Sequence, residues 1–252
     1  HPLNVSDEIY TGFMYLCILP ATVQSAIALT SLAGGNVAAA ICSASASSLL
    51  GVFISPLLVG LVMNIHSDSA GASVEQVGSI MLQLLLPFVI GHLSRRWIGG
   101  WVERNRGLIG KTDQASILLV VYSAFSEAVV NGIWSRVGVT TLLLILVGCL
   151  GILFVVLAIN LLAARLFGFN RADEITIIFC GSKKSLANGV PMANILFPAS
   201  AVGIIVLPLM IFHQVQLMAC SMIAVRYKKK AEAEAASQLA NSTGKAVVES
   251  QK

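Results

Sequence analysis

The stretch "IFCGSKKSLANGVPMANILF", residues 178–197, poses the central question of this sequence. Both flanks are apolar, yet Lys183 and Lys184 lie side by side in the middle. A lysine at the centre of a membrane helix costs about 2.5–3.5 kcal/mol on insertion scales, and snorkelling relieves only lysines near a helix end. The segment is also interrupted by small or ring residues, namely Gly181, Gly189 and Pro191. We therefore expect a broken helix whose centre faces a polar cavity.

The composition of the whole chain indicates a membrane protein. Of its 252 residues, 56% are hydrophobic and only 11% are charged, and the mean hydropathy is +0.84. Soluble domains carry about a quarter charged residues, so a soluble chain of this composition could not cover its own surface. The net charge of +4 comes from basic residues beside apolar segments, and no nucleic-acid partner is expected. The predicted fold class is an all-α, polytopic protein embedded in a lipid bilayer.

Apolar segments of roughly the length needed to cross a bilayer, about 20 residues each, recur along the chain. About eight are expected, the first two being short, at residues 8–20, 21–34, 36–63, 74–93, 115–134, 139–167, 175–197 and 199–225. The remaining tail, residues 227–252, is small and polar and is expected to be disordered or a frayed helix.

The positive charges alternate between successive connectors. One set of connectors contains Arg95, Arg96, Arg104, Arg106, Lys111, Arg165, Arg171, Arg226, Lys228, Lys229 and Lys230. The other set contains only Arg136. Because cytoplasmic loops of membrane proteins carry the excess of lysine and arginine, the C-terminus is predicted to be cytoplasmic.

A second interrupted segment, "LPATVQSAIALTSLAGGNVAAAICSASASSLLG", covers residues 19–51. Pro20 and the pair Gly34–Gly35 bracket a stretch that carries Thr22, Gln24 and Ser25. Two interrupted segments in corresponding halves point to a transporter's binding site, because unwound backbone is tolerated only against protein, water or ligand. We expect the two breaks to face each other, although the small residues 35–48 also suit close helix packing alone.

The motifs "LPATVQSAIALTSLAGGNVAAAI" and "FCGSKKSLANGVPMA" resemble the bile acid:sodium symporter superfamily, and are most similar to its SBF-like branch. The resemblance runs over residues 12–225. It implies ten helices in two inverted repeats, a core and a panel domain, two crossed broken helices and transport by alternating access.

On that template the chain corresponds to the third to the tenth helices, so further helices would precede His1. The crossed helices would be residues 21–34 and 175–197, in a bacterial inner-membrane protein. The implied division is residues 1–73 for the end of the first repeat (core), 74–137 for the panel helices, 138–226 for the core helices of the second repeat, and 227–252 for the cytoplasmic tail.

The chain departs from the sodium-coupled members of that superfamily at their ion ligands. Their glutamate and Gln-Asn pair are replaced here by Phe179 and by the two lysines, and their hydroxyl ligands by Ala40 and Ala44, with Ser43 close by. An ammonium group is itself a cation and repels sodium. A lysine in that place could neutralise the carbonyl ends of broken helices, and could couple transport to protons if it lost and regained a proton.

Two further ionisable residues lie inside apolar segments. Glu127 is the only acid well inside such a segment, and either faces the cavity as an ion pair or proton carrier or forms a structural pair near the outer surface. His213 is a natural proton carrier or a partner of a backbone carbonyl. The complete set of expected solute- and ion-binding residues is Thr22, Gln24, Ser25, Asn36, Ser43, Glu127, Gly181, Ser182, Lys183, Lys184, Ser185, Asn188 and His213.

The predicted function is secondary transport of a small organic, anionic solute, with protons favoured over sodium as the coupling ion and without a cofactor. The sequence contains no HExxH, GxSxG or Walker A motif and no His/Cys cluster at metal spacing, so an enzyme is not expected. Two alternatives stay open at this point, a monovalent cation/proton antiporter and a membrane regulator that transports nothing.

Overall fold

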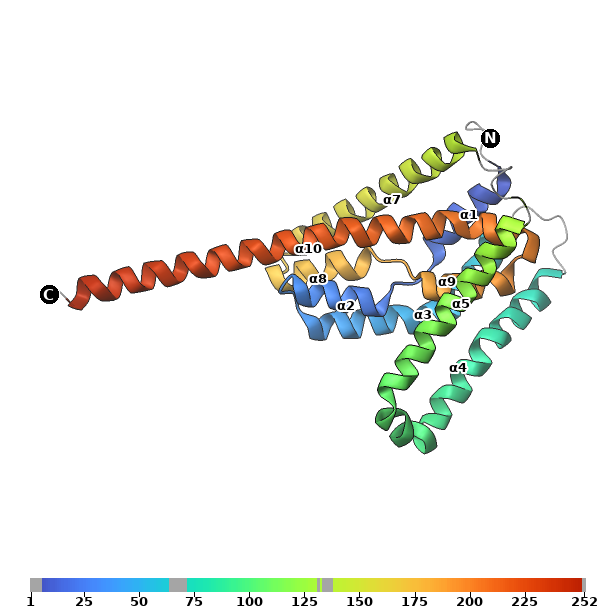
Figure 1. Cartoon of the computed structure of the whole chain (residues 1–252), viewed down its shortest axis with the longest axis horizontal. Coiled ribbons are helices and arrows are strands. Elements are labelled where there is room, and N and C mark those ends of the chain that lie inside the picture. The colour runs from blue at the N-terminus through green and yellow to red at the C-terminus, as the bar shows by residue number, and fades with distance from the viewer. Residues whose placement is uncertain (1–5, 64–71, 131, 133–137, 251–252) are drawn as a thin grey trace.

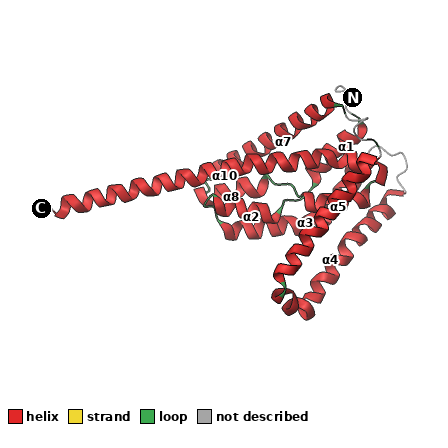
Figure 2. Cartoon of the chain, viewed as in Figure 1, coloured by secondary structure: helices red, strands yellow, loops and turns green. Residues whose placement is uncertain are grey.

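The computed structural model describes residues 6–63, 72–130, 132 and 138–250, and within these ranges the chain is helical and without strands (Figure 1, Figure 2). This confirms the all-α prediction. The helices are α1 (Asp7–Ile18), α2 (Val23–Leu32), α3 (Val37–Met63), α4 (Ala72–Arg104), α5 (Arg106–Val130), α7 (Val139–Leu166), α8 (Arg171–Gly181), α9 (Leu186–Leu196) and α10 (Ala199–Ser250).

Helices α1 and α2 form one broken element, bent by 60° at residues 19–22, the first break. α1 ends because Pro20 disfavours helical geometry in the residue before it, and Leu19 is extended with φ −66° and ψ 145°. We expected residues 8–20 and 21–34 to be separate segments, with the latter alone as the crossed helix. That division was wrong, because Pro20 lies inside the broken element rather than at its start.

The pair Gly34–Gly35 closes α2 and turns the chain into α3. Gly34 adopts a left-handed φ of 75°, which favours glycine. The backbone N–H of Gly35 donates to the carbonyl of Thr30 at 2.8 Å, a bond typical of helix C-termini. The glycines therefore mark a helix end and not the break.

Helices α8 and α9 form the other broken element, and residues 182–185 between them are the second break. Ser185 caps α9, since its hydroxyl accepts a hydrogen bond from the backbone N–H of Asn188 at 3.2 Å. α8 starts at Arg171, earlier than expected, because the Asn170 side chain accepts from the N–H of Asp173 at 2.9 Å. The interruption predicted within residues 175–197 is thus present, at residues 182–185. Gly189 and Pro191, which were also expected to interrupt this segment, lie inside α9 instead.

Helix α10 is the element around which the bundle packs. It contacts α1, α2, α5, α7 and α9, and buries Leu209 and Phe212 against residues such as Tyr15 of α1. Helices α4 and α5 form a hairpin at one side of the bundle (Figure 1). Whether this hairpin acts as a panel domain stays a prediction.

Beyond the bundle, α10 continues as one helix to Ser250, where we expected a disordered or frayed tail (Figure 1). The segment is rich in alanine, glutamate and lysine, which are strong helix formers. Lys228 and Glu232 also form an i,i+4 ion pair with 3.9 Å between Nζ and Oε1.

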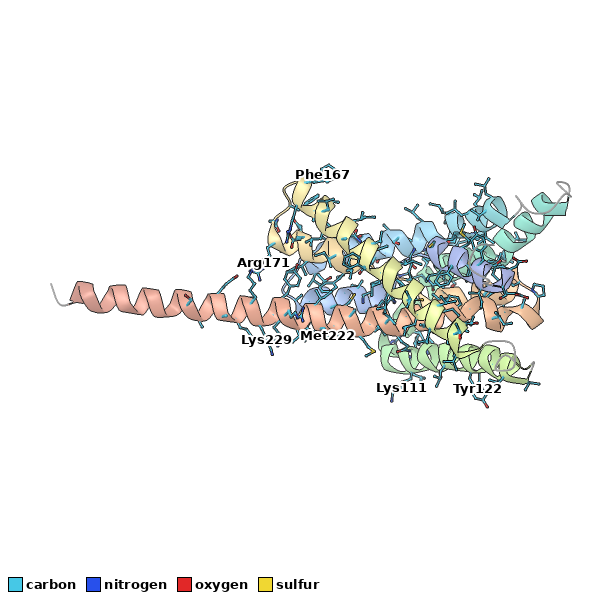
Figure 3. The ribbon with its side chains drawn as sticks, turned by 90° about the horizontal axis from the view of Figure 1, so that it is seen from above. Lys111, Tyr122, Phe167, Arg171, Met222 and Lys229 are labelled. Carbon is cyan, nitrogen blue, oxygen red and sulfur yellow. The ribbon has the colours of Figure 1, made fainter. Side chains whose placement is uncertain are left out.

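By length and composition, two of the described helical segments could cross a membrane, Val139–Leu166 and Ala201–Ser237. The number rises to four if each of two bent pairs counts as one span, namely α1 with α2 and the two parts of α3. The eight expected spans are therefore not confirmed. The outer surface is suited to lipid, with Tyr122, Phe167 and Met222 pointing outward (Figure 3).

Candidate functional site

The two breaks touch each other, although they are more than 160 residues apart in the sequence. The backbone N–H of Ser185 donates to the carbonyl of Pro20 at 3.0 Å. The Thr22 hydroxyl donates to the carbonyl of Lys184 at 2.9 Å. We call residues 19–22 and 182–185 together the crossing region.

The ammonium group of Lys184 binds the C-terminal end of α1. Its Nζ lies 2.8 Å from the carbonyl oxygen of Cys17 and 2.9 Å from that of Leu19. The last carbonyls of a helix lack partners within the helix and carry partial negative charge. Lys184 is therefore a covalently tethered cation at a helix C-terminus.

The remaining carbonyls at this helix end are also paired. The Ser55 hydroxyl on α3 donates to the carbonyl of Ile18 at 3.0 Å, and Pro20 is bonded by Ser185. All four carbonyls from Cys17 to Pro20 thus accept a hydrogen bond from another element. This pairing allows an unwound segment to exist away from water.

Lys183 has a different environment. It is only 1% exposed, and its Nζ makes no hydrogen bond of regular geometry with the described residues, although the Cys220 thiol lies near it. Its ionisable neighbours are His213 and Cys220, both on α10. A buried ammonium group without a partner is costly, so it requires an anion, water or loss of its proton.

Helix α10 presents a polar stripe to the second break, formed by His213, Gln216 and Cys220 at i, i+3 and i+7. Gln216 is fully buried. Its Oε1 accepts from the N–H of Lys184 at 2.9 Å and its Nε2 donates to the carbonyl of Lys184 at 2.9 Å. Gln216 was not among the residues predicted from the sequence, although its spacing from His213 within an apolar helix indicates that the two side chains share a face.

Several other predicted residues lie in or next to the crossing region. Ser182 Oγ lies 3.8 Å from Cys220 Sγ, and Asn188 is in the first turn of α9. A Cβ at Gly181 would lie 2.4 Å from the end of the Asn160 side chain of α7, so α7 and α8 approach closely here and a larger residue would displace that side chain. On α2, the hydroxyl of Ser25 is buried with no partner among the described residues.

Other predicted residues are placed elsewhere. Gln24 is exposed on α2, and Ser43 is exposed on α3, near Cys180. Asn36 donates to the carboxylate of Asp173 at 2.9 Å, at the opposite end of α8 from the crossing region. Glu127 belongs to α5, but its side chain lies outside the described residues.

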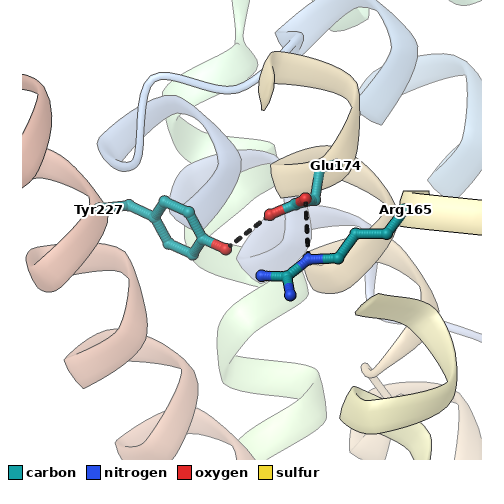
Figure 4. A network of polar contacts seen from close by, with 3 residues as sticks. All are labelled: Arg165, Glu174 and Tyr227. Atoms are coloured by element: carbon teal, nitrogen blue, oxygen red, sulfur yellow. Dashed lines mark hydrogen bonds and ion pairs between the residues drawn. The ribbon is translucent and has the colours of Figure 1, made fainter. Parts of the chain in front are cut away.

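A separate polar network joins α7, α8 and α10 at the N-terminal end of α8 (Figure 4). The Tyr227 hydroxyl donates to Glu174 Oε1 at 3.1 Å, and Arg165 Nε lies 3.7 Å from Glu174 Oε2. Arg171 pairs with Glu234 nearby, with 2.5 Å between Nη1 and Oε2. These contacts link α10 to α7 and α8 at the point where α10 extends beyond the bundle.

Comparison with known proteins identifies the family of this chain. The sequence matches the SBF-like CPA transporter family over residues 2–229. It is 70% identical to "Putative symporter YfeH" of Escherichia coli (strain K12) over 231 residues, which are 92% of this chain and 69% of that protein. It is 30% identical over 230 residues to "Sodium/bile acid cotransporter 7" of Xenopus tropicalis, and the match covers 89% of this chain and 65% of that protein. It is 31% identical over 235 residues to the Rattus norvegicus protein of the same name, and that match covers 89% of this chain and 66% of the relative. The chain therefore belongs to the SBF-like CPA transporter family of membrane proteins.

Proposed function

We propose that this chain provides the solute-translocating core of a secondary transporter that moves a small organic anion by alternating access. The observation that carries the proposal is the buried amine of Lys183, which has no partner among the described residues. An anionic group of the solute would supply that partner, and charge-assisted hydrogen bonds are the strong ones. The crossing region is the place where such a solute would bind.

The surroundings of the crossing region also favour an anion. Ser25, in the first turn of α2, offers a buried hydroxyl that makes no hydrogen bond to any residue the structure describes. Helix N-termini favour negative charge because their first N–H groups are free to donate. Relatives are named as sodium/bile acid cotransporters, which makes a bile acid anion the first probe for this chain.

Lys184 argues against sodium as the coupling ion. Its ammonium already binds the carbonyls of Cys17 and Leu19, at the end of α1 where a bound cation would be stabilised. Sodium prefers oxygen ligands, and a neighbouring ammonium repels it. We infer that transport is coupled to protons and is independent of sodium.

Uptake into proteoliposomes tests this function. A labelled bile acid would be offered under a proton gradient or a sodium gradient imposed separately, with Lys183→Ala, Lys184→Ala and, as a matched control, the exposed Lys229→Ala. We expect uptake that follows the proton gradient and is lost in the first two variants only.

Two results would contradict the proposal. Unchanged uptake by Lys183→Ala would show that Lys183 does not bind the anion. Uptake that depends on sodium would contradict the proposed coupling to protons. Exchange of sodium or potassium for protons without any organic solute would instead support a cation/proton antiporter.

We also propose that the protein resides in a bacterial inner membrane with the C-terminus of α10 in the cytoplasm. The support is the clustering of Arg226, Lys228, Lys229 and Lys230 after the last apolar segment. Alkaline phosphatase fused after Lys252 is expected to be inactive and a fluorescent protein fused there to be fluorescent. The reverse pattern would invert the orientation.

A further inference from the structure

The side chain of Gln216 links His213 to the backbone of the second break. It holds both the N–H and the carbonyl of Lys184, and its Nε2 also lies 3.0 Å from Nδ1 of His213. Gln216 is fully buried, so water cannot replace these bonds readily. Its carboxamide group therefore connects a titratable ring to an unwound segment of the chain.

The chemistry of the backbone fixes the role of every atom in this contact. The N–H of Lys184 can only donate, so it must face Oε1 of Gln216, and the carbonyl of Lys184 can only accept, so it must face Nε2. The second hydrogen on Nε2 then points at His213 Nδ1. Because two donors cannot pair, Nδ1 is an unprotonated acceptor and the imidazole carries its proton on Nε2.

We propose that His213 is a proton-binding site that controls the second break through Gln216. A proton taken from the aqueous phase onto Nδ1 turns this atom from an acceptor into a donor. The ring then opposes the Nε2–H of Gln216, and it also faces the backbone of Lys184, where it competes for the same carbonyl. Gln216 releases Lys184, and the second break loses its attachment to α10.

The other titratable groups around this site are largely committed to partners. Lys184 binds α1, the Tyr15 hydroxyl of α1 donates to the carbonyl of Gly189 at 2.6 Å, and the Cys149 thiol of α7 donates to that of Pro208. The further groups are Cys17 on α1, Cys220 on α10, and Lys111, Tyr122 and Glu127 on α5, of which Lys111 and Tyr122 are exposed and the Glu127 side chain is not described.

Lys183 determines whether anion binding favours or opposes proton binding at His213. Its amine lies close enough to His213 for the two charges to repel each other. An anion bound at Lys183 removes that repulsion, so anion and proton favour each other's binding. This step rests on the proposed function and assigns the coupled proton to His213 rather than to a lysine.

Hydrogen–deuterium exchange of residues 182–190 tests the proposal in the protein reconstituted in lipid nanodiscs. We expect exchange at about pH 5 to be roughly five-fold faster than at about pH 8 after correction for the intrinsic rate, the factor that corresponds to one net hydrogen bond. His213→Asn keeps an acceptor for Gln216 but cannot take a proton, so its exchange should not respond to pH. Gln216→Met should exchange fast at both pH values, and the control His92→Asn should match the wild type.

The proposal is overturned if the wild type shows no response to pH, or if His213→Asn responds equally. A measurement on the wild type alone guards against variants that fail to fold: ¹⁵N spectra of labelled histidine at about pH 8 should show His213 protonated on Nε2, and a proton on Nδ1 would overturn the assignment. Neither readout requires a solute. A pH response without anion uptake would thus support the proton site and contradict the proposed function. Proton-independent anion uptake with no pH response would contradict the proton site and the proton coupling, but would leave the proposed anion transport standing.

Discussion

The two breaks have similar positions in their broken elements but largely opposite hydrogen-bonding characters, the exception being the Thr22 hydroxyl, which donates to the carbonyl of Lys184. The first break, produced by Pro20, exposes carbonyl groups at the end of α1 and carries no charged residue. The second break supplies donors, the ammonium of Lys184 and the N–H of Ser185. The second break therefore supplies the hydrogen-bond donors that the carbonyl groups of the first break require. The ammonium of Lys184 occupies the place at the end of α1 where a bound cation would otherwise be needed.

The largest expected effect separates the two lysines of the second break. Lys184→Met removes two charge-assisted hydrogen bonds and leaves the carbonyls of Cys17 and Leu19 unpaired, which should lower the free energy of unfolding by about 3 kcal/mol. Lys183→Met removes a buried amine that has no hydrogen-bond partner in the described part of the chain, so stability should be unchanged or higher. Thermal unfolding in detergent would measure both, and equal losses would contradict the distinction.

The next effect tests how tightly the first broken element is packed. At Gly12 a Cβ would lie 2.5 Å from the carbonyl oxygen of Ile205 on α10, and at Gly51 it would lie 2.4 Å from the ring of Pro20. Each alanine substitution should cost about 1–3 kcal/mol of unfolding free energy. Gly151→Ala on α7 is the matched control, since a Cβ added there would have no atom of the described residues within 4 Å. A comparable loss in that variant would show that packing is not the cause.

A smaller effect concerns the contact between α1 and α9. The buried hydroxyl of Tyr15 donates to the carbonyl of Gly189 at 2.6 Å. Tyr15→Phe should therefore reduce the unfolding free energy by about 1 kcal/mol, as measured by the same thermal unfolding assay. Tyr122→Phe, at an exposed ring on α5, should leave the unfolding free energy unchanged. Equal changes in the two variants would show that the hydrogen bond between Tyr15 and Gly189 does not stabilise the protein.

The smallest effect is expected far from both breaks. Arg165 is 67% exposed, so its ion pair with Glu174 is well screened by solvent. Glu174→Gln should cost less than about 1 kcal/mol and should leave uptake unchanged. Loss of uptake in this variant would show that the network at the start of α8 takes part in transport.

The two interruptions could be predicted from local sequence alone. Adjacent lysines in an apolar segment require polar surroundings wherever the segment lies, and Pro20 disfavours helical geometry in the residue before it. Proline alone does not decide the outcome, since Pro191 and Pro208 lie inside helices. The expectation that the breaks face each other comes from the pairing of two interrupted segments, and Ser182, Ser185 and Thr22 do lie at the crossing. The all-helical fold follows from composition.

The rest depends on contacts between distant segments, which local sequence does not encode. Pro20 reads equally well as the start of a helix or as a break within one, and only its contact with Ser185 decides. Gln216 is one polar residue in an apolar helix until the backbone of Lys184 meets it. Asn36 reads as a site residue, but the Asp173 carboxylate that it binds is 137 positions away.

The length of α10 makes it a lever. At 1.5 Å per residue its 52 residues span about 78 Å, against about 30 Å for the hydrocarbon core of a bilayer. From His213 to the far end the arm is roughly 55 Å, so a tilt of about 5° beside the second break would swing Ser250 through roughly 5 Å. A tilt beside the second break that is too small to detect there would thus produce a larger displacement at the C-terminal end of α10.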